Sequence, residues 1–243
     1  HIWLFIISFF MFFTVFCQEL KDNSIKKSND SITNKNNPIR LRAGIDLFKP
    51  IISQFNSDYQ GIELVGDLNF YKNLFIAAEL GSEKKTIQSE QINFTTNGSY
   101  LKLGVDYNLY KNLKGMNNSI YLGLRYGRSV HSHKVNNYLV YITHHYWDTN
   151  LTQNGYATGE RSTLSSGWLE FVFGMKTELI LNFYLGISVR LSRILSQNQP
   201  ENFGNLYVPG FNKVTDGNNF GAAFNYTLTY SFPFRFKKKS INP

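Results

Sequence analysis

Four histidines form the group of side chains that could most readily hold a transition metal, because neutral imidazole is a common metal ligand. His131 and His133 form one pair, and His144 and His145 form a second pair within the same interval, residues 131–166. Their spacing matches no metal-binding motif in which the coordination geometry fixes the positions of the ligands. We therefore expect a solvated, tyrosine-rich loop here, and we predict no metal site and no cofactor.

Catalytic side chains would be a second source of chemistry. No Ser/His/Asp set and no pair of carboxylates occurs in the order that a known catalytic motif requires. An acyltransferase or a protease would need loop residues that converge in space, which the spacing does not indicate. The single cysteine, Cys17, also excludes an internal disulfide. The sequence therefore predicts that this protein is not an enzyme.

Charged residues recur at alternate positions along the chain, in equal numbers of the two signs. The cations are Arg40, Arg42, Lys102, Arg125, Lys176 and Arg190, and the anions are Asp46, Glu63, Asp67, Glu79, Asp106 and Glu170. Residues two apart on a β-strand share a face, so this pattern places the charges on one face of a sheet. Charges enclosed on such a face must pair, because a buried unpaired charge is strongly destabilising.

Apolar residues occupy the opposite alternate positions and define the predicted strands. Leu101 and Leu103, for example, alternate with Lys102 and Gly104. The same period of two recurs from residue 40 onward and gives about eight strands, most of them near the 9–11 residues that a tilted membrane strand needs. No comparable helical period is present. The fold class is therefore all-β.

The predicted connections alternate between short and long. Residues 71–73 and 179–182 form tight turns, and 111–118 is fairly short, whereas the other links, near 49–58, 82–98, 131–166 and 195–218, are longer. Outer-membrane barrels have short periplasmic turns and long extracellular loops. We therefore expect a transmembrane, antiparallel up-and-down β-barrel that crosses the outer membrane many times and has both termini in the periplasm.

The segment Asn136–Trp147 leaves the number of strands open, because it alternates within the longest predicted loop. It could form an extracellular hairpin, or it could add a strand pair and give ten strands. A soluble eight-stranded barrel would also alternate. Its interior is only just wide enough for its side chains, and an apolar face of Leu, Ile, Phe and Tyr is too bulky to fit inside. The membrane barrel is therefore favoured.

The enclosed charges admit two interpretations. In a narrow lumen they would form a salt-bridge network that specifies the barrel and closes it. A selective ion path would need a wider barrel or an excess of one sign. Because the two signs balance, we expect a closed lumen and not a porin.

The two ends of the chain are expected to lie outside the barrel. Residues 1–17 are predicted to be a cleaved secretory signal peptide, with a less favoured alternative in which Cys17 is a lipoprotein cysteine. Residues 18–38 are rich in Asn, Ser and Lys and are predicted to be a disordered periplasmic lead-in. The barrel is expected over residues 39–236. Residues 237–243 form a basic periplasmic tail.

The last strand ends in alternating aromatic residues. Tyr230, Phe232, Phe234 and Phe236 resemble the aromatic C-terminal strand that the barrel-assembly machinery reads. Pro233 interrupts this strand and is tolerated at a strand end or a bulge. These four aromatic residues are therefore the predicted assembly signal.

The net charge of +8 and the isoelectric point near 9.4 do not indicate a nucleic-acid-binding protein. Much of the excess lies in two tails, around residues 21–35 and at 237–239. A nucleic-acid footprint would gather basic residues on one face with interleaved aromatics. No such face is present, so no nucleic acid is expected among the partners.

The alternating strands from Arg40 to Phe236, the Asn-, Lys- and Tyr-rich composition, and Cys17-Gln18-Glu19 at the end of the signal segment together resemble a known group. The chain is similar to the small single-barrel outer-membrane proteins of Bacteroidetes-type bacteria and, more broadly, to OmpX/OmpA-like barrels of uncharacterised function. The resemblance implies contact with outer-membrane lipids and the barrel-assembly machinery. No functional residue carries over.

Three functional hypotheses follow. The first, also implied by the resemblance, is a non-enzymatic structural or accessory subunit that binds other envelope proteins or lipoproteins, within a secretion or barrel-assembly complex. The second is a surface adhesion or ligand-binding barrel that uses the loop at 131–166. The third is a narrow channel. The sequence identifies neither the partner nor the ligand.

Overall fold

The structure is a computed structural model that describes residues 39–89, 92–112, 117–140, 151–152, 159–198, 205–213 and 219–234. Its main elements are eight long strands: β1 (Ile39–Asp46), β2 (Tyr59–Tyr71), β3 (Leu74–Gln88), β4 (Ile92–Asn108), β5 (Ser119–Val140), β7 (Gly159–Ile180), β8 (Phe183–Gln197) and β11 (Phe220–Phe234). The remaining elements are one helix, α2 (Phe48–Phe55), and three two-residue strands, β6 (Leu151–Thr152), β9 (Tyr207–Val208) and β10 (Asn212–Lys213).

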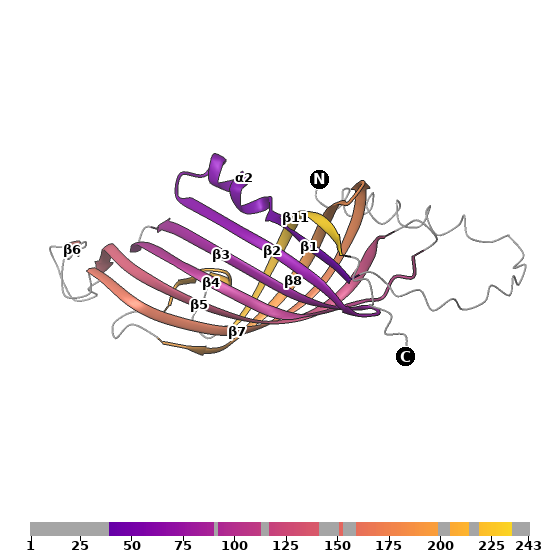
Figure 1. The fold of residues 1–243 in the computed structure, drawn as a ribbon. Helices are drawn as coiled ribbons and strands as arrows, with labels where there is room; N and C mark the ends of the chain where they lie inside the picture. Colours follow the sequence, from indigo (N-terminus) through magenta and orange to yellow (C-terminus); the bar gives the residue numbers. More distant parts are fainter. Residues whose placement is uncertain are drawn as a thin grey trace, which may run out of the picture. The chain divides into compact units, whose positions relative to one another are not determined.

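The eight long strands close into an antiparallel barrel (Figure 1). Each strand pairs with the next along the chain, and β1 pairs with β11 from Ile39↔Phe234 to Asp46↔Thr227, which joins the first strand to the last. β6 adds only two residue pairs with the end of β5. The prediction of an eight-stranded up-and-down barrel is confirmed, and the ten-stranded alternative is wrong for the described residues.

The barrel is apolar outside and polar inside, which is the inverse of a soluble protein. Large hydrophobic side chains are exposed along the strands, among them Leu64, Leu80, Leu103, Leu124, Phe171, Phe173, Leu191 and Phe224. The alternate positions carry the buried charges and hydroxyls. We call the exposed apolar band the belt. A closed barrel with such a belt is a membrane β-barrel, because the strands pair with both neighbours along most of the belt and apolar side chains meet the lipid.

The turns at one end are tight, as predicted. Lys72 and Asn73 join β2 to β3, and Leu181 and Asn182 join β7 to β8. Lys72 and Asn182 have positive φ angles of 40° and 69°, the left-handed conformation that two-residue hairpins require. Among the described residues, no helix is long enough and apolar enough to be a membrane span.

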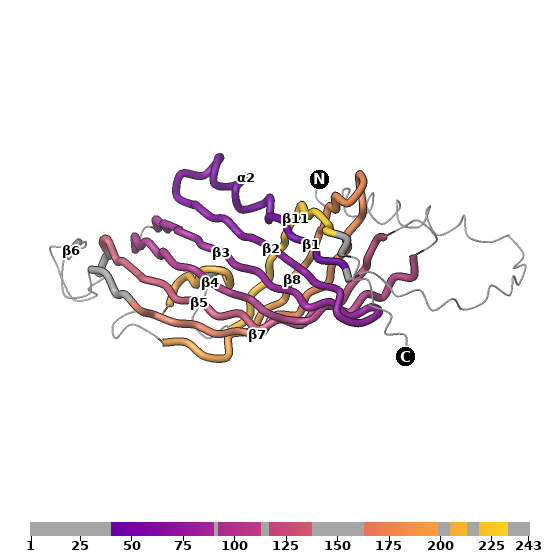
Figure 2. The backbone as a smooth tube through the Cα atoms, viewed as in Figure 1, coloured from indigo at the N-terminus to yellow at the C-terminus, as the bar shows by residue number. Residues whose placement is uncertain are grey.

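At the opposite end the strands are longer than predicted (Figure 2). β3 and β4 continue through most of the predicted loop 82–98, and β5 and β7 each have 22 residues and cover much of the predicted loop 131–166. The prediction of a long loop is wrong for 82–98, and the loop at 131–166 is shorter than predicted, whereas the link from Gln197 of β8 to Phe220 of β11 is long as predicted. Beyond the belt the outer face of a strand is polar, so the hydrophobic alternation fades although backbone pairing continues.

Two smaller elements at this end were not predicted. α2 fills most of the link between β1 and β2, where the sequence analysis found no helical period. β9 and β10 form a hairpin within the link between β8 and β11. Val208 and Phe211 of this hairpin pack in a buried cluster with Tyr100, Trp168 and Ile194. The hairpin therefore folds inward and fills the wide end of the barrel, which we call the mouth.

Several predicted features lie outside the described residues. These are the signal peptide at 1–17, the lead-in at 18–38, His144 and His145, Phe236 and the basic tail at 237–243. Within β11, Phe232 lies on the outer face and Tyr230 packs at 4.9 Å from it, ring to ring. β11 runs through Pro233 to Phe234, and Pro233 pairs with Arg40 near the end of both strands.

Candidate functional site

The lumen is filled by charged side chains from seven of the eight long strands, arranged in three layers, and β11 adds the amide of Asn225. The layer nearest the tight turns centres on Asp67 of β2. Its carboxylate accepts a bond from Arg42 Nε at 2.6 Å and pairs with Lys176 Nζ at 2.5 Å. The Arg42 guanidinium also lies over the rings of Phe75, at 4.8 Å, and Tyr184, at 5.4 Å. This layer closes the narrow end.

The middle layer centres on Glu79 of β3. Arg125 donates to Glu79, Arg190 pairs with it at 2.6 Å, and Lys102 lies 3.7 Å away. The neighbouring carboxylates share these cations: Arg125 also bonds Asp106 at 3.0 Å, and Lys102 bonds Glu170 at 3.0 Å. The pairs of Glu79 with Arg190 of β8 and with Arg125 of β5 tie together strands that are not neighbours.

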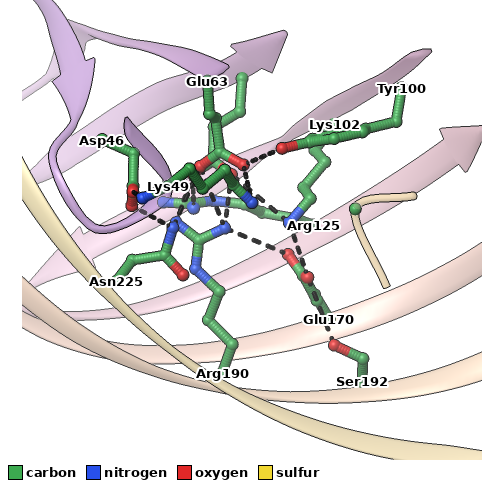
Figure 3. A network of polar contacts seen from close by, with 12 residues as sticks. Asp46, Lys49, Glu63, Tyr100, Lys102, Arg125, Glu170, Arg190, Ser192 and Asn225 are labelled. Carbon is green, nitrogen blue, oxygen red and sulfur yellow. Dashed lines mark hydrogen bonds and ion pairs between the residues drawn. The ribbon is translucent and has the colours of Figure 1, made fainter. Parts of the chain in front are cut away.

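The layer nearest the mouth centres on Glu63 of β2 (Figure 3). Tyr100 donates to one oxygen of Glu63, and the Asn225 side-chain amide donates to the other at 3.1 Å. Lys49 of α2 reaches down into the barrel, with Nζ at 3.2 Å from Glu63 and 2.7 Å from Glu83. Asn225 also bonds Asp46 at 2.5 Å. The helix is thus fastened to the lumen by one buried cation.

The structure places eleven of the twelve predicted lumen charges in this network. Arg40 differs: it is half-buried, its Nη1 donates to Asn117 at 2.6 Å, and it makes no ion pair within the described part of the chain. Four further members of the network were not predicted from the sequence: Lys49, Glu83, Tyr100 and Asn225. Glu83 and Tyr100 do occupy inward alternate positions, but in stretches treated as loop or strand edge. Nothing in the sequence pattern signals that Lys49 points into the lumen.

The middle of the barrel has almost no free space. A cavity beside Glu79, Arg125, Lys176 and Arg190 has a volume of about 20 Å³, which is room for about one water molecule. Because each cation there contacts at least one carboxylate, the described lumen holds a plug of interlocking ion pairs. The arrangement can specify and stiffen the barrel.

The mouth contains a larger cavity of about 420 Å³. It is bounded by α2, by the β9–β10 hairpin, by the ends of β2 and β3, and by β11. Tyr207 of the hairpin donates to Glu83 at 2.7 Å, and the Gly210 amide donates to the same oxygen at 3.1 Å. Burial, followed by the charge of Glu83, raises the pKa of Tyr207. The tyrosine therefore stays a neutral donor.

Lys49 keeps its charge in this setting. Burial alone would lower the pKa of its ammonium, but Glu63 and Glu83 raise it well above the usual value. α2 carries the group, and no side chain of α2 is fully buried. The ion pairs of Lys49 are therefore the main polar attachment of the helix to the barrel.

His131 and His133 do not lie in a solvated loop, and that prediction is wrong. Both are buried and point into the barrel from β5, beyond the belt, where the outward neighbours Ser132 and Lys134 are polar. Thr96 Oγ1 lies 2.9 Å from His133 Nδ1, and His131 Nε2 lies 3.5 Å from Asn205 Oδ1. Beyond the belt the outward residues are polar and do not alternate with the inward ones in hydrophobicity. The strand could therefore not be recognised there from the sequence.

The histidine pair is held as neutral imidazole. Burial, and then His131, lowers the pKa of His133 to about 4, and the ring stacks on Phe94 at 4.8 Å between centroids. Within the described segments, no group of three or more His, Cys, Asp or Glu side chains could hold a metal ion. The pair therefore packs the wall beneath the hairpin.

Comparisons with known proteins add a family and a distant structural likeness. A family model described as a domain of unknown function, DUF6048, matches residues 2–238. A search of curated proteins finds no match. Among solved structures, the attachment invasion locus protein Ail of Yersinia pestis is similar over 80% of this chain and 97% of its own, with 11% identity and a TM-score of 0.38. A likeness this weak carries no functional inference.

Proposed function

The chain belongs to the family of the domain of unknown function DUF6048, and we propose that it is a sealed, non-enzymatic outer-membrane barrel that binds other envelope proteins as a structural or accessory subunit. The observation that carries this proposal is the filled lumen. Ten of the predicted charges form ion pairs inside the barrel, and the cavity beside Glu79 has a volume of about 20 Å³. Because the lumen of such a barrel is filled, the parts left to contact other molecules are its outer surfaces. A role in binding is therefore favoured.

The outer membrane is the proposed location because closed barrels with an apolar belt are the form in which β-strands cross that membrane. In the proposed orientation the tight turns, and with them both termini, face the periplasm. The long strand ends, α2 and the hairpin then face outward, which matches the usual asymmetry of short inner turns and tall outer strands.

A second candidate, surface adhesion or ligand binding, is favoured by the height of the wall. β5 and β7 have 22 residues each, about twice the 9–11 that a membrane strand needs. Their outer ends and those of β3 and β4 carry exposed polar side chains, among them Lys84, Asn97, Ser99, Lys134 and Asn136. The contact surface would be this polar wall, not the loop at 131–166 alone.

The subunit proposal is tested by purifying the affinity-tagged protein from outer membranes in mild detergent and identifying what accompanies it by mass spectrometry. We expect an envelope protein in a stoichiometric amount. A barrel that always runs alone, while shifting on gels after heating as folded barrels do, would contradict the subunit role.

Three charge reversals separate the candidates. Lys84→Glu and Lys134→Glu alter the polar wall, whereas Lys111→Glu alters an exposed lysine at the tight-turn end. If the partner sits outside the cell, the first pair should reduce cell attachment several-fold and Lys111→Glu should not. If the partner is an envelope subunit reached from the periplasm, Lys111→Glu should reduce the amount of co-purified partner, and Lys84→Glu and Lys134→Glu should not.

A further inference from the structure

The barrel wall is incomplete near the mouth. β1 ends at Asp46, where it pairs with Thr227 of β11, and its last partner on β2 is Leu64 for Ile45. β2 continues beyond that level to Tyr59 along β3, and β11 continues to Phe220 along β8. The upper edges of β2 and β11 therefore face each other across a gap, and no described strand fills it.

α2 occupies this gap without sealing it (Figure 1). Leu47 N donates to Tyr226 O at 2.6 Å on the β11 side, and Gly61 N donates to Ser53 Oγ at 3.0 Å on the β2 side. The apolar side chains of the helix stay open: Phe48 is 41% exposed, Ile51 52% and Phe55 88%. A short helix that buries none of its side chains is held loosely.

The 420 Å³ cavity passes around the free edge of β11. Ala223 and Asn225 line it from the inner face of that strand, and Ala222 and Phe224 line it from the outer face. Successive residues of a strand point to opposite faces. The cavity therefore lies along the unpaired edge of β11, where the lumen mouth meets the membrane side of the wall.

The two parts of this cavity differ in chemistry. The membrane side is continuous with the belt, because Phe224 is 58% exposed and Leu191 and Ile62 are exposed on the flanking strands. The inner side carries Lys49, Lys85 and Lys102 with Glu83. Lys49 and Lys102 are already paired with carboxylates, whereas Lys85 makes no ion pair within the described part of the chain; its Nζ lies 4.9 Å over the Tyr207 ring.

We propose that this cavity is a lateral binding site for a membrane lipid with an anionic headgroup, taken from the leaflet that surrounds the mouth. The acyl chain lies against α2 and Phe224, and the headgroup enters past the edge of β11 toward Lys85. The volume falls within the range of ligand sites, roughly 300–1,000 Å³, and the combination of apolar walls with a few convergent polar groups is typical of them. The site is independent of any protein partner.

The test uses the full purified chain in phosphatidylcholine nanodiscs that contain a small fraction of phosphatidylglycerol with a photoactivatable group in its acyl chain. Cross-links are mapped by mass spectrometry. We expect the peptides that contain α2 and residues 220–226 to be labelled several-fold more than peptides from the rest of the belt. Labelling that is even around the barrel would overturn the proposal.

Three variants locate the site. Ala223→Trp fills the inner part of the cavity and Lys85→Gln removes the unpaired cation, and each should reduce the excess labelling several-fold. Ala78→Trp makes the same size change on the outer face of β3, away from the gap, and should leave labelling unchanged. Ala223→Trp is scored only if it shows the heat-dependent gel shift of a folded barrel, and otherwise Lys85→Gln decides.

Two further arms identify the ligand. A phosphatidylcholine probe with the same photoactivatable chain should label the site less, and equal labelling by both probes would overturn the anionic assignment. Soluble glycerol phosphate should not displace the lipid probe at matched concentration. If it does, the headgroup alone is the ligand, and the lateral lipid site is refuted. Because no partner protein is present, these outcomes are separate from those of the co-purification.

Discussion

The middle of the lumen and its mouth are lined by the same kinds of residue but have different structures. Around Glu79 the wall is complete, cations and carboxylates interlock, and about 20 Å³ remains free. At the mouth β1 ends early, Lys49 enters from a helix, and about 420 Å³ remains. Inward charged side chains fill the lumen only at the level where all eight strands complete the wall. Where one strand is missing, similar residues line a cavity.

The largest expected effect comes from Glu79→Gln in the middle layer. The change leaves Arg125, Arg190 and Lys102 without their shared carboxylate, and breaking a buried ion pair costs about 3–5 kcal/mol. We expect the free energy of unfolding, measured by urea titration of the barrel in lipid vesicles, to fall by about that amount. Asp58→Asn, an exposed carboxylate outside the lumen, is the control. A loss equal to that of the control would show that the middle layer is not a stabilising plug.

The hairpin at the mouth should respond strongly to Gly210→Ala. Gly210 has a φ of +81°, and a Cβ there would lie 2.5 Å from the Tyr100 ring, so both backbone strain and a clash oppose the change. The expected cost is about 1–3 kcal/mol, seen as faster hydrogen exchange in 205–213. Gly66→Ala is the matched control because the nearest atom to its added Cβ lies at 3.5 Å. Equal exchange in both variants would mean that the hairpin is not packed on Tyr100.

Lys49→Met should have a smaller effect that is confined to the mouth. Glu63 keeps Tyr100 and Asn225, and Glu83 keeps Tyr207 and Gly210, so the loss is about 1–3 kcal/mol for the hydrogen bonds of one charged group. We expect faster proteolysis within 47–58 and unchanged resistance of the strands. Lys84→Met, on the exposed face of β3, should not alter the cleavage rate. Cleavage of the variant at the wild-type rate would remove Lys49 as the attachment of α2.

The smallest expected effect is a pH dependence at the histidine pair. The pKa of His133 in the folded protein is about 4, below the ordinary histidine value of roughly 6.5. As the pH falls through this window, the unfolded chain binds a proton that the folded chain excludes, so stability decreases. Urea midpoints should drop between about pH 7 and about pH 5, and less so in His133→Gln. An identical drop in that variant would assign the pH dependence to other groups.

The sequence contained enough information for the barrel but not for its mouth. Within the belt, each strand alternates between lipid and lumen, so a period of two marks both the strand and its inward charges. That is why the strands near Leu103 and Phe171 and the set from Arg42 to Arg190 could be predicted. Beyond the belt, water meets the outer face, and His131 and His133 could not be told from loop residues.

The sequence by itself determined the all-β barrel, the two faces of its strands and most of the lumen charges, because these depend only on local alternation and on the cost of burying a charge. Only the tertiary structure decided where β1 stops relative to β2 and β11, that α2 turns Lys49 inward, and that the β9–β10 hairpin folds into the mouth. These features depend on register between strands far apart in the chain and on which side chains meet there. No local pattern encodes such long-range contacts.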